Sequence, residues 1–449
     1  REGRGRGAAL VSRAPAASAR PPAAAGSGPA AGPSHDTAAG GHRHTATPWE
    51  RARATAARAG AAAGSRSHRT PLADALGEVL AGPLEALTDL PSFDTSAMDG
   101  WAVAGPGPWR VRGTDDAAAG DPGGVLAGSA PAAPLADGEA VRIATGARIP
   151  ADTTAVIRSE HAHHDPAKAR LYAEREVHTG QDIRPRGQEC RSGDLLLPAG
   201  VPVTPAVLGL AAAAGYDELT TVARPRVEVL VLGDELLSSG LPREGLIRDA
   251  LGPLLGPWLT ALGAEVVGTR RLGDDAEALY AAVTGSTADL VLTTGGTAAG
   301  PVDHVHPVLH RAGAELLVDG VAVRPGHPML LARLASGRHL VGLPGNPLAA
   351  VSGLLTLAEP LLRALAGHGP APLYTVPVRD EVQGHPYDTR LVPVVLRGEH
   401  AVPLRYNGPA MLRGIAAADA LAVVPPHGAR AGQELELLDL PWPHGRCFT

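Results

Sequence analysis

The sequence has little cysteine, little lysine and no long apolar run, and each shortage excludes a class of protein. Its 449 residues include only Cys190 and Cys447, too few for a disulfide framework or a four-cysteine zinc site, which fits a reducing cytoplasm. Lys168 is the single lysine, which we interpret as a coding bias without chemical meaning. No apolar run approaches the roughly 18 residues that span a bilayer. We therefore expect a cytoplasmic protein with no membrane partner.

Charge is divided unevenly along the chain. Residues 1–70 carry 11 arginines against three acidic residues, a net charge of +8, whereas the remainder carries 29 basic and 43 acidic residues. An acidic folded part is not expected to bind nucleic acid broadly. Residues 1–70 also hold few large apolar side chains, so burial cannot offset the entropy lost when the backbone becomes ordered. We predict a disordered extension over residues 1–70.

The next part of the chain predicts a linking domain interrupted by a β-rich module. Residues 71–86 open with an apolar helical periodicity, and residues 193–223 contain an Ala-rich helical stretch. These two segments are expected to pack together as a helical linking domain. Residues 87–192, inserted between them, contain short strands separated by Gly and Pro turns, which predicts a β-rich module.

The second half predicts an α/β domain followed by a small β domain. Residues 224–372 alternate strands, Gly-containing loops and helical patterns, which is typical of a doubly wound parallel sheet. Residues 373–449 return to short alternating runs and predict a C-terminal β-barrel. In doubly wound sheets ligands bind beyond the carboxyl ends of the strands, and that is where the Gly-containing loops fall.

Two of these loops carry features of a phosphate and metal site. Asp234 and Glu235 follow one strand, and paired carboxylates beside an anionic ligand favour a bridging Mg²⁺. The alternative is a helix cap. Gly295 and Gly296 follow another strand, where backbone amides without an intervening Cβ can converge on an anion. The alternative there is a tight turn.

The remaining turns offer rigid backbone and cationic groups. Residues 344–347 read Pro-Gly-Asn-Pro, and residues 324–328 read Arg-Pro-Gly-His-Pro. Such turns hold backbone close to a ligand at low entropic cost, and Arg324 and His327 add charge. In the β-rich module Asp99 precedes a Gly, as a turn residue does. The histidines at 161–164 lack a second cluster, so we interpret them as a solvated loop.

Seven motifs, in this order and approximate spacing, resemble the molybdopterin molybdenumtransferase family, to which the C-terminal domain of gephyrin belongs. The resemblance runs from about Pro71 to the end of the chain. The motifs are Ser96-Ala-Met-Asp-Gly100, Ile143-Ala-Thr-Gly-Ala147, Arg186-Gly-Gln-Glu189 before Gly193-Asp194, Gly233-Asp-Glu-Leu236, Gly295-Gly296, Pro325-Gly-His-Pro328 and Gly342-Leu-Pro-Gly-Asn-Pro347.

The resemblance implies an elongated four-part subunit that forms a homodimer with a site shared between subunits. It implies insertion of molybdate into adenylylated molybdopterin, with Mg²⁺ as cofactor and AMP as a product. It also implies a molybdopterin-adenylating protein upstream and molybdoenzyme acceptors downstream.

The family motifs assign roles by position. The catalytic residues implied are Asp99, Glu235, Asp249 and Asp303, and the metal ligands implied are Glu235, Asp303 and Glu189. The ligand-binding residues implied are Thr145, Gly146, Asp234, Gly295, Gly296, Arg324, Pro325, Gly326, His327, Pro344, Gly345, Asn346 and Pro347.

Some positions depart from the family pattern. Ala298 and Pro301 remove a hydroxyl and a carboxylate from the Gly-Gly loop, Ala349 replaces a serine, and His327 replaces a lysine, so its charge depends on pH. Two hypotheses follow. The chain is a molybdenum insertase in which His327, Arg324 and Arg248 supply substitute contacts, or a weakened paralogue that binds molybdopterin or serves as a scaffold.

Overall fold

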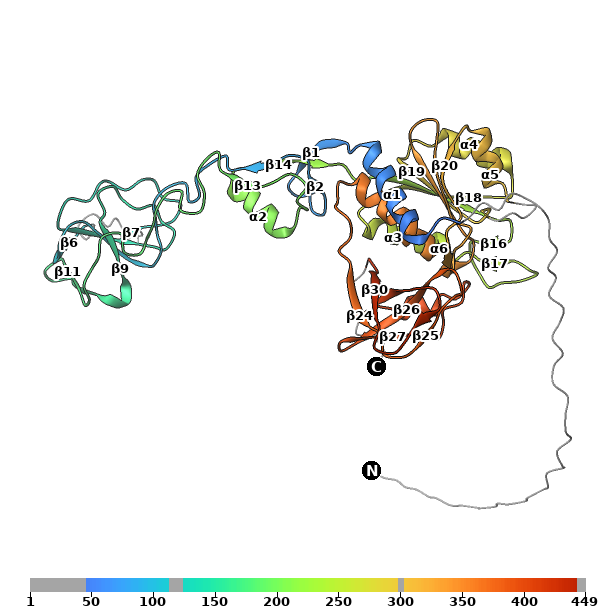
Figure 1. The fold of residues 1–449 in the computed structure, drawn as a ribbon. Coiled ribbons are helices and arrows are strands. Elements are labelled where there is room, and N and C mark those ends of the chain that lie inside the picture. The colour runs from blue at the N-terminus through green and yellow to red at the C-terminus, as the bar shows by residue number, and fades with distance from the viewer. Residues whose placement is uncertain (1–45, 113–123, 298–302, 442–449) are drawn as a thin grey trace, which may run out of the picture. The chain divides into compact units, whose positions relative to one another are not determined.

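The computed structural model describes residues 46–112, 124–297 and 303–441 (Figure 1). The α/β part contains a six-stranded sheet in the order β18-β15-β19-β23-β22-β20. The first four strands are parallel to one another. At the other edge, β22 pairs antiparallel with both β23 and β20. The predicted doubly wound sheet is therefore confirmed. The strands are β15 Arg226–Leu232, β18 Glu265–Leu272, β19 Leu290–Thr294, β20 Glu315–Asp319, β22 Leu330–Arg333 and β23 His339–Leu343.

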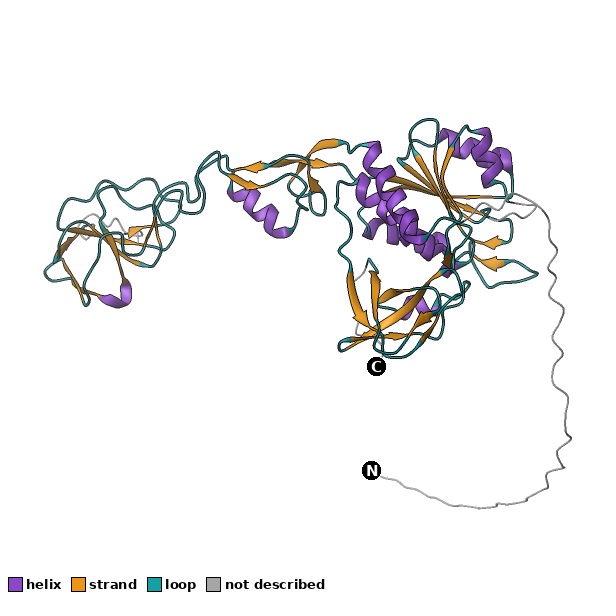
Figure 2. Ribbon diagram, in the orientation of Figure 1, coloured by secondary structure: helices purple, strands orange, loops and turns teal. Residues whose placement is uncertain are grey.

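Helices cover both faces of this sheet (Figure 2). On strand β15, Val229 faces a core shared with α3 Leu251–Ala261, whereas Leu230 faces a core shared with α4 Ala276–Gly285 and α5 Val305–Arg311. Successive side chains of a strand point to opposite faces, so a strand buried on both sides reads as a continuous apolar run. The short strands β16 Leu236–Leu237 and β17 Ile247–Arg248 pair in parallel beside the sheet.

A 19-residue helix over Pro347–Leu365 forms the centre of the larger core. It consists of α6 Pro347–Gly353, a π-helical turn η2 Leu354–Ala358 and α7 Glu359–Leu365. By its length and its mean hydropathy of 1.5, this helix could cross a membrane. The sequence does not indicate this, because polar residues interrupt the apolar run. Because 78% of it is buried inside the fold, it is accounted for as a core helix.

Helix α1, Trp49–Ala63, corrects the prediction of a disordered extension over residues 1–70. Its buried face is formed by Trp49, Ala52, Ala56 and Gly60, and it packs against η2 and α7. Apart from Trp49 these residues are small and bury little surface by themselves, but they allow two helix backbones to approach closely. The stability of this helix thus comes from tertiary packing, which composition does not report. Residues 1–45 lie outside the described structure.

The linking region joins the two predicted segments, but its first segment is not helical. Residues 72–78 form turns between short strands, and Gly77 there adopts a φ of 81°, which interrupts a helix. Helix α2, Pro205–Ala213, forms as predicted and shares one small core with both segments. The strands are β1 Ser67–Pro71, β2 Val79–Leu80, β3 Leu84–Glu85, β13 Leu195–Leu197 and β14 Glu218–Val222.

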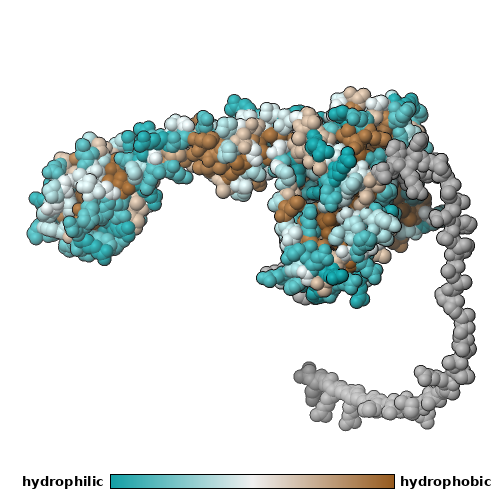
Figure 3. Space-filling view, viewed as in Figure 1, coloured by the Kyte–Doolittle hydropathy of each residue, from teal (hydrophilic) through white to brown (hydrophobic). Residues whose placement is uncertain are grey.

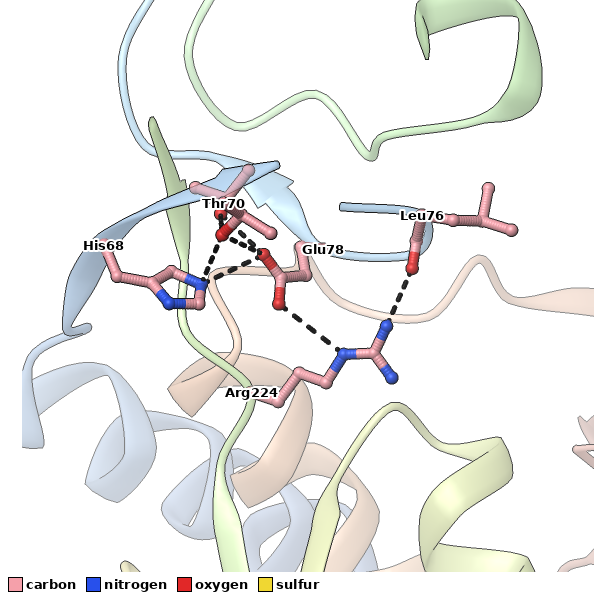
Figure 4. Close-up of polar contacts among 6 residues, drawn as sticks. His68, Thr70, Leu76, Glu78 and Arg224 are labelled. Atoms are coloured by element: carbon pink, nitrogen blue, oxygen red, sulfur yellow. Dashed lines mark hydrogen bonds and ion pairs between the residues drawn. The ribbon is translucent and has the colours of Figure 1, made fainter. Parts of the chain in front are cut away.

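Buried Glu78 holds residues 71–86 against the sheet of β1, β14 and β2. Its Oε2 accepts hydrogen bonds from the hydroxyls of Thr70 at 3.1 Å and Thr221 at 2.5 Å, and lies 3.0 Å from Nε2 of His68 (Figure 4). Nε of Arg224 lies 3.6 Å from the other oxygen. A buried carboxylate is tolerated only with such partners, so Glu78 ties together β1, β14 and the chain entering the α/β sheet.

The β-rich module is confirmed as a seven-stranded sheet with apolar side chains on both faces. Strand β5 lies between β8 and β9 and pairs with both. The elements of this region are β4 Thr95–Ser96, β5 Gly100–Val103, β6 Trp109–Val111, β7 Gly124–Val125, β8 Glu139–Ile143, β9 Ala155–Arg158, η1 Ser159–His161, β10 Ala162–Asp165, β11 Arg170–Ala173 and β12 Ile183–Arg184.

The C-terminal part is also β-rich, and its sheet includes one strand that belongs to the α/β part of the chain. Strand β21, Val323–Arg324, leaves the α/β part and pairs in parallel with β26. Closure of this sheet into a barrel stays a prediction. The other elements are β24 Tyr374–Pro377, β25 Val382–Gln383, β26 Thr389–Arg397, β27 His400–Pro403, α8 Arg413–Ala417, β28 Ala420–Val424, β29 Gly428–Ala429 and β30 Glu434–Asp439.

Candidate functional site

A cavity of about 580 Å³ opens where β15, β19 and β23 end. The loop with Glu235, the Gly295-Gly296 loop and the turn of residues 344–347 all line it. They meet there because the carboxyl ends of neighbouring parallel strands lie at one edge of a sheet. We call it the acidic cavity, since Glu235, Asp249, Asp274 and Asp303 line it against the single cation Arg248. Its predicted backbone contributors are Gly295, Gly296, Pro344, Gly345, Asn346 and Pro347.

The Gly-Gly loop has a left-handed backbone that favours glycine. Gly295 and Gly296 have φ values of 80° and 66°, a region that residues with a Cβ rarely adopt. The Gly295 amide donates to the carbonyl oxygen of Leu343 at 2.8 Å, so this amide ties the loop to the end of β23. Ala298 and Pro301, two of the substituted positions, lie outside the described residues.

Not every predicted acid has the same place in this cavity. Asp249 is mostly buried, and its Oδ1 accepts hydrogen bonds from the amides of Leu251 and Gly252 at 3.0 and 2.9 Å. It therefore holds the first turn of α3 as well as lining the cavity. Asp234 lies against Gly273 and is not among the lining residues, so the paired carboxylates diverge.

A second cavity of about 410 Å³ adjoins the first, because Pro328, Pro344 and Asn346 line both. Its charged and titratable lining consists of Arg324, His327 and Arg390, with no carboxylate, and we call it the basic cavity. The predicted residues Pro325 and Gly326 and the substituted position Ala349 also line it.

Two of the basic cavity's cations are held by defined contacts. Nε of Arg324 donates to Oδ2 of Asp388 at 2.8 Å, which fixes one side of the guanidinium. Nδ1 of His327 lies 2.8 Å from the carbonyl oxygen of Val321. A carbonyl only accepts, so Nδ1 of His327 carries a proton.

Asp99 and Thr145 form a separate arrangement in the β-rich module. The Thr145 amide donates to Oδ1 of Asp99 at 2.7 Å. Hydrogen bonds from Thr145, first its amide and then its hydroxyl, hold the pKa of Asp99 below its usual value. This carboxyl therefore stays ionised at neutral pH. Asp99, Thr145, Gly146 and Glu189 line neither cavity within the described chain.

The predicted metal ligands are not assembled within one chain. Glu235 and Asp303 line the acidic cavity, whereas Glu189 lies in the turn before Cys190. Among the residues that the structure describes, no three His, Cys, Asp or Glu side chains are grouped to hold a metal ion. The interpretation of the histidines at 161–164 as a solvated loop is wrong, because His161 ends η1 and His163 and His164 belong to β10, where the ring of His164 lies 5.1 Å from that of Trp101.

Sequence reasoning missed Arg390, Asn407 and Asp274. Arg390 and Asn407 belong to the C-terminal part and reach the basic cavity because β26 pairs with β21. No local pattern indicates that pairing. Asp274 follows β18, and its position after a strand was the signal that could have been used.

Three family profiles match consecutive parts of the chain. Residues 47–215 match "MoeA N-terminal region (domain I and II)", residues 228–364 match "Probable molybdopterin binding domain", and residues 375–440 match "MoeA C-terminal region (domain IV)". The profile boundaries agree with the structure. The first profile begins at Thr47, which forms a backbone bridge with Val321, and the second covers the strands of the α/β sheet.

Individual relatives agree with these profiles. A "Molybdopterin molybdenumtransferase 2" of Mycobacterium tuberculosis is 36% identical over 314 residues, covering 66% of this chain and 75% of the relative. A "Molybdopterin molybdenumtransferase" of Staphylococcus aureus is 28% identical over 379 residues, covering 82% and 90%. The solved structure of a "molybdopterin biosynthesis moea protein" from Pyrococcus horikosii superposes with a TM-score of 0.71 at 26% identity, covering 89% of this chain and 100% of that chain.

Proposed function

Because the chain belongs to the molybdopterin molybdenumtransferase family, we propose that it inserts molybdate into adenylylated molybdopterin, with hydrolysis of the phosphoanhydride and release of AMP. It is a transferase of molybdenum cofactor biosynthesis. The observation that carries the detailed proposal is the pair of adjoining cavities, one lined by Gly-rich backbone and carboxylates and the other by Arg324, His327 and Arg390.

The two cavities suit different parts of the reaction. The Gly295-Gly296 turn, where no Cβ keeps a ligand from the backbone, and the guanidinium of Arg248 suit the phosphate groups of the adenylylated pterin in the acidic cavity. Arg324, His327 and Arg390 suit the molybdate oxyanion, because guanidinium and imidazole N–H groups donate hydrogen bonds to an anion and the Asp388 carboxylate is already paired with Arg324. The shared residues Pro344 and Asn346 place the two ligands side by side.

The donor set of the acidic cavity fits Mg²⁺ held jointly by protein and substrate. Mg²⁺ binds through one or two carboxylates together with phosphate oxygens and water, and Glu235 and Asp303 provide two carboxylates. The bound ion would neutralise charge on the phosphoanhydride. The protein's own part is to orient the substrate phosphates against the glycine turn and to keep both carboxyls on one side of them.

We propose that the second subunit of a homodimer completes the site with Asp99, Thr145 and Glu189. Apolar surface gathers around α2 and β13 in Figure 3, where Leu76, Leu87 and Leu195 expose 48, 56 and 62% of their surface. Exposed apolar side chains in such a group favour contact with another protein surface. The hydrogen bond from Thr145 keeps Asp99 ionised, as a group that contacts a cation or positions water requires.

The same proposal includes the pathway partners. A molybdopterin-adenylating protein supplies the substrate and molybdoenzymes accept the product. The alternative of a weakened paralogue is not favoured, because the profiles match all three regions of the chain and the predicted loops converge on one cavity.

An AMP-release assay tests the activity. The purified chain is mixed with adenylylated molybdopterin, molybdate and Mg²⁺, and AMP and the molybdenum-loaded pterin are measured. We expect stoichiometric AMP release that requires both molybdate and Mg²⁺. Binding of the pterin without AMP release would favour the scaffold hypothesis instead.

A further inference from the structure

A backbone contact links the N-terminal end of the described chain to the loop that carries Arg324 and His327. The Thr47 amide donates to the carbonyl oxygen of Gly320 at 3.0 Å, and the Ala322 amide donates to the carbonyl oxygen of Thr47 at 2.8 Å. These two bonds form a parallel bridge between Thr47 and Val321. Neither bond involves a side chain of Thr47, so the contact depends on the path of the backbone.

Val321 makes two contacts that fix the position of His327. Its amide donates to the carbonyl oxygen of His327 at 2.9 Å, and its carbonyl oxygen lies 2.8 Å from Nδ1 of the same ring. Both the backbone and the imidazole of His327 are therefore set by the position of Val321. A shift of Val321 moves the ring that lines the basic cavity.

The neighbouring residue extends the connection to the C-terminal part. The carbonyl oxygen of Ala322 accepts a hydrogen bond from the amide of Thr389 at 3.1 Å, next to Arg390. Ala322 is thus held from both sides, since its amide donates to Thr47 and its carbonyl oxygen accepts from Thr389, the residue before the cavity-lining Arg390.

Helix α1 fixes Thr47 to the rigid centre of the molecule. Trp49 is 3% exposed, and its Nε1 donates to the hydroxyl of Thr356 at 3.1 Å. The guanidinium of Arg53 donates to the carbonyl oxygen of Leu355 and lies 3.9 Å from Glu359. In Figure 1, α1 (blue) runs beside the central helix (orange). Thr47 therefore moves with η2 and α7.

We propose that residues 47–63 form an N-terminal clamp that positions His327 and Arg324 for oxyanion binding. The inference rests on the proposed function, since the oxyanion is taken to be molybdate. Thr47 touches no ligand and is a positioning residue. Its action is to restrict the loop of residues 320–329 to the conformation in which the three cations of the basic cavity converge.

Substitutions at one position separate backbone from side chain. Thr47→Pro removes the amide that donates to Gly320, whereas Thr47→Ala keeps both backbone bonds and serves as the matched control. Molybdate binding to the full chain is measured by calorimetry, and steady-state KM values are measured for molybdate and for adenylylated molybdopterin. Circular dichroism and thermal unfolding report whether each variant is folded.

We expect Thr47→Pro to weaken molybdate binding about fivefold, the net contribution of one hydrogen bond. The KM for adenylylated molybdopterin should stay unchanged, and Thr47→Ala should behave as wild type. Amide hydrogen exchange over residues 320–329 should become faster in Thr47→Pro.

The outcomes separate this inference from the proposed function. Equal molybdate affinity of Thr47→Pro and wild type overturns the clamp alone, and so does an equal loss for both substrates, which indicates a general structural role. Absence of molybdate binding by the wild type overturns both the clamp and the assignment of the basic cavity.

Discussion

At the scale of single residues, His327 lines the basic cavity at the position where the family motif has a lysine. The other charged groups that line this cavity are Arg324 and Arg390, and Asp388 is already paired with Arg324. Nδ1 of His327 faces the carbonyl oxygen of Val321, so that nitrogen is engaged within the loop. We therefore expect the ring to contact an anion through Nε2.

His327→Ala should weaken molybdate binding, because the anion loses one contact of the basic cavity. His327→Lys should retain it, because an ammonium group at this position also attracts an anion. Calorimetric titration of molybdate into the wild type and both variants checks the prediction. Equal affinity of the wild type and His327→Ala would exclude His327 as an anion contact.

At the scale of elements, a helix requires glycine only where the backbone of another helix approaches it closely. A Cβ on Gly60 of α1 would lie 2.5 Å from the carbonyl oxygen of Leu361 and 2.8 Å from the Cβ of Ala364. A Cβ on Gly209 of α2 would meet nothing within 4 Å. Gly60 is thus retained for packing of α1 on α7, whereas Gly209 only lowers the stability of its helix.

The two glycines provide a matched pair of substitutions. Gly60→Ala should destabilise the protein by about 1 to 3 kcal/mol, because the helices must separate. Gly209→Ala should stabilise it by about 0.5 to 1 kcal/mol through helix propensity. Thermal unfolding followed by circular dichroism checks both signs. A stabilised Gly60→Ala variant would show that α1 does not pack on α7 in solution.

At the scale of the whole molecule, the proposed site needs two chains. Asp99 and Glu235 lie in different parts of the subunit: Glu235 lines the acidic cavity, whereas Asp99 lines neither the acidic nor the basic cavity within the described residues. If Asp99 is supplied by the partner, one wild-type site survives in a mixed dimer of two differently substituted subunits. The geometry of a two-fold dimer thus makes the proposal testable by complementation.

Asp99→Asn and Glu235→Gln should each abolish AMP release while leaving the fold intact. An equimolar mixture, unfolded and refolded together, should recover about one quarter of wild-type activity, since half of the dimers are mixed and each has one complete site. Separately refolded variants serve as the control. No recovery on mixing would place both residues in the site of one subunit, and full activity of both single variants would reject the site assignment.

Much of the architecture follows from local sequence. The apolar runs that become β15, β19 and β23 are buried on both faces, and the glycines after β19 have φ values that a Cβ disfavours. Periodicity and turn chemistry report such features because they depend on near neighbours in the chain. The position of the acidic cavity follows from them, since parallel strands end at one edge.

The sequence by itself determined the doubly wound sheet, the glycine turns and the edge of the sheet at which the acidic cavity lies, because each depends on a few consecutive side chains. Only the tertiary structure decided that Arg390 joins Arg324, that Glu78 draws residues 71–86 into a sheet, and that Thr47 bridges to Val321. These contacts join residues far apart in the chain. Their stability comes from surfaces that exist only after folding, so no local pattern reports them.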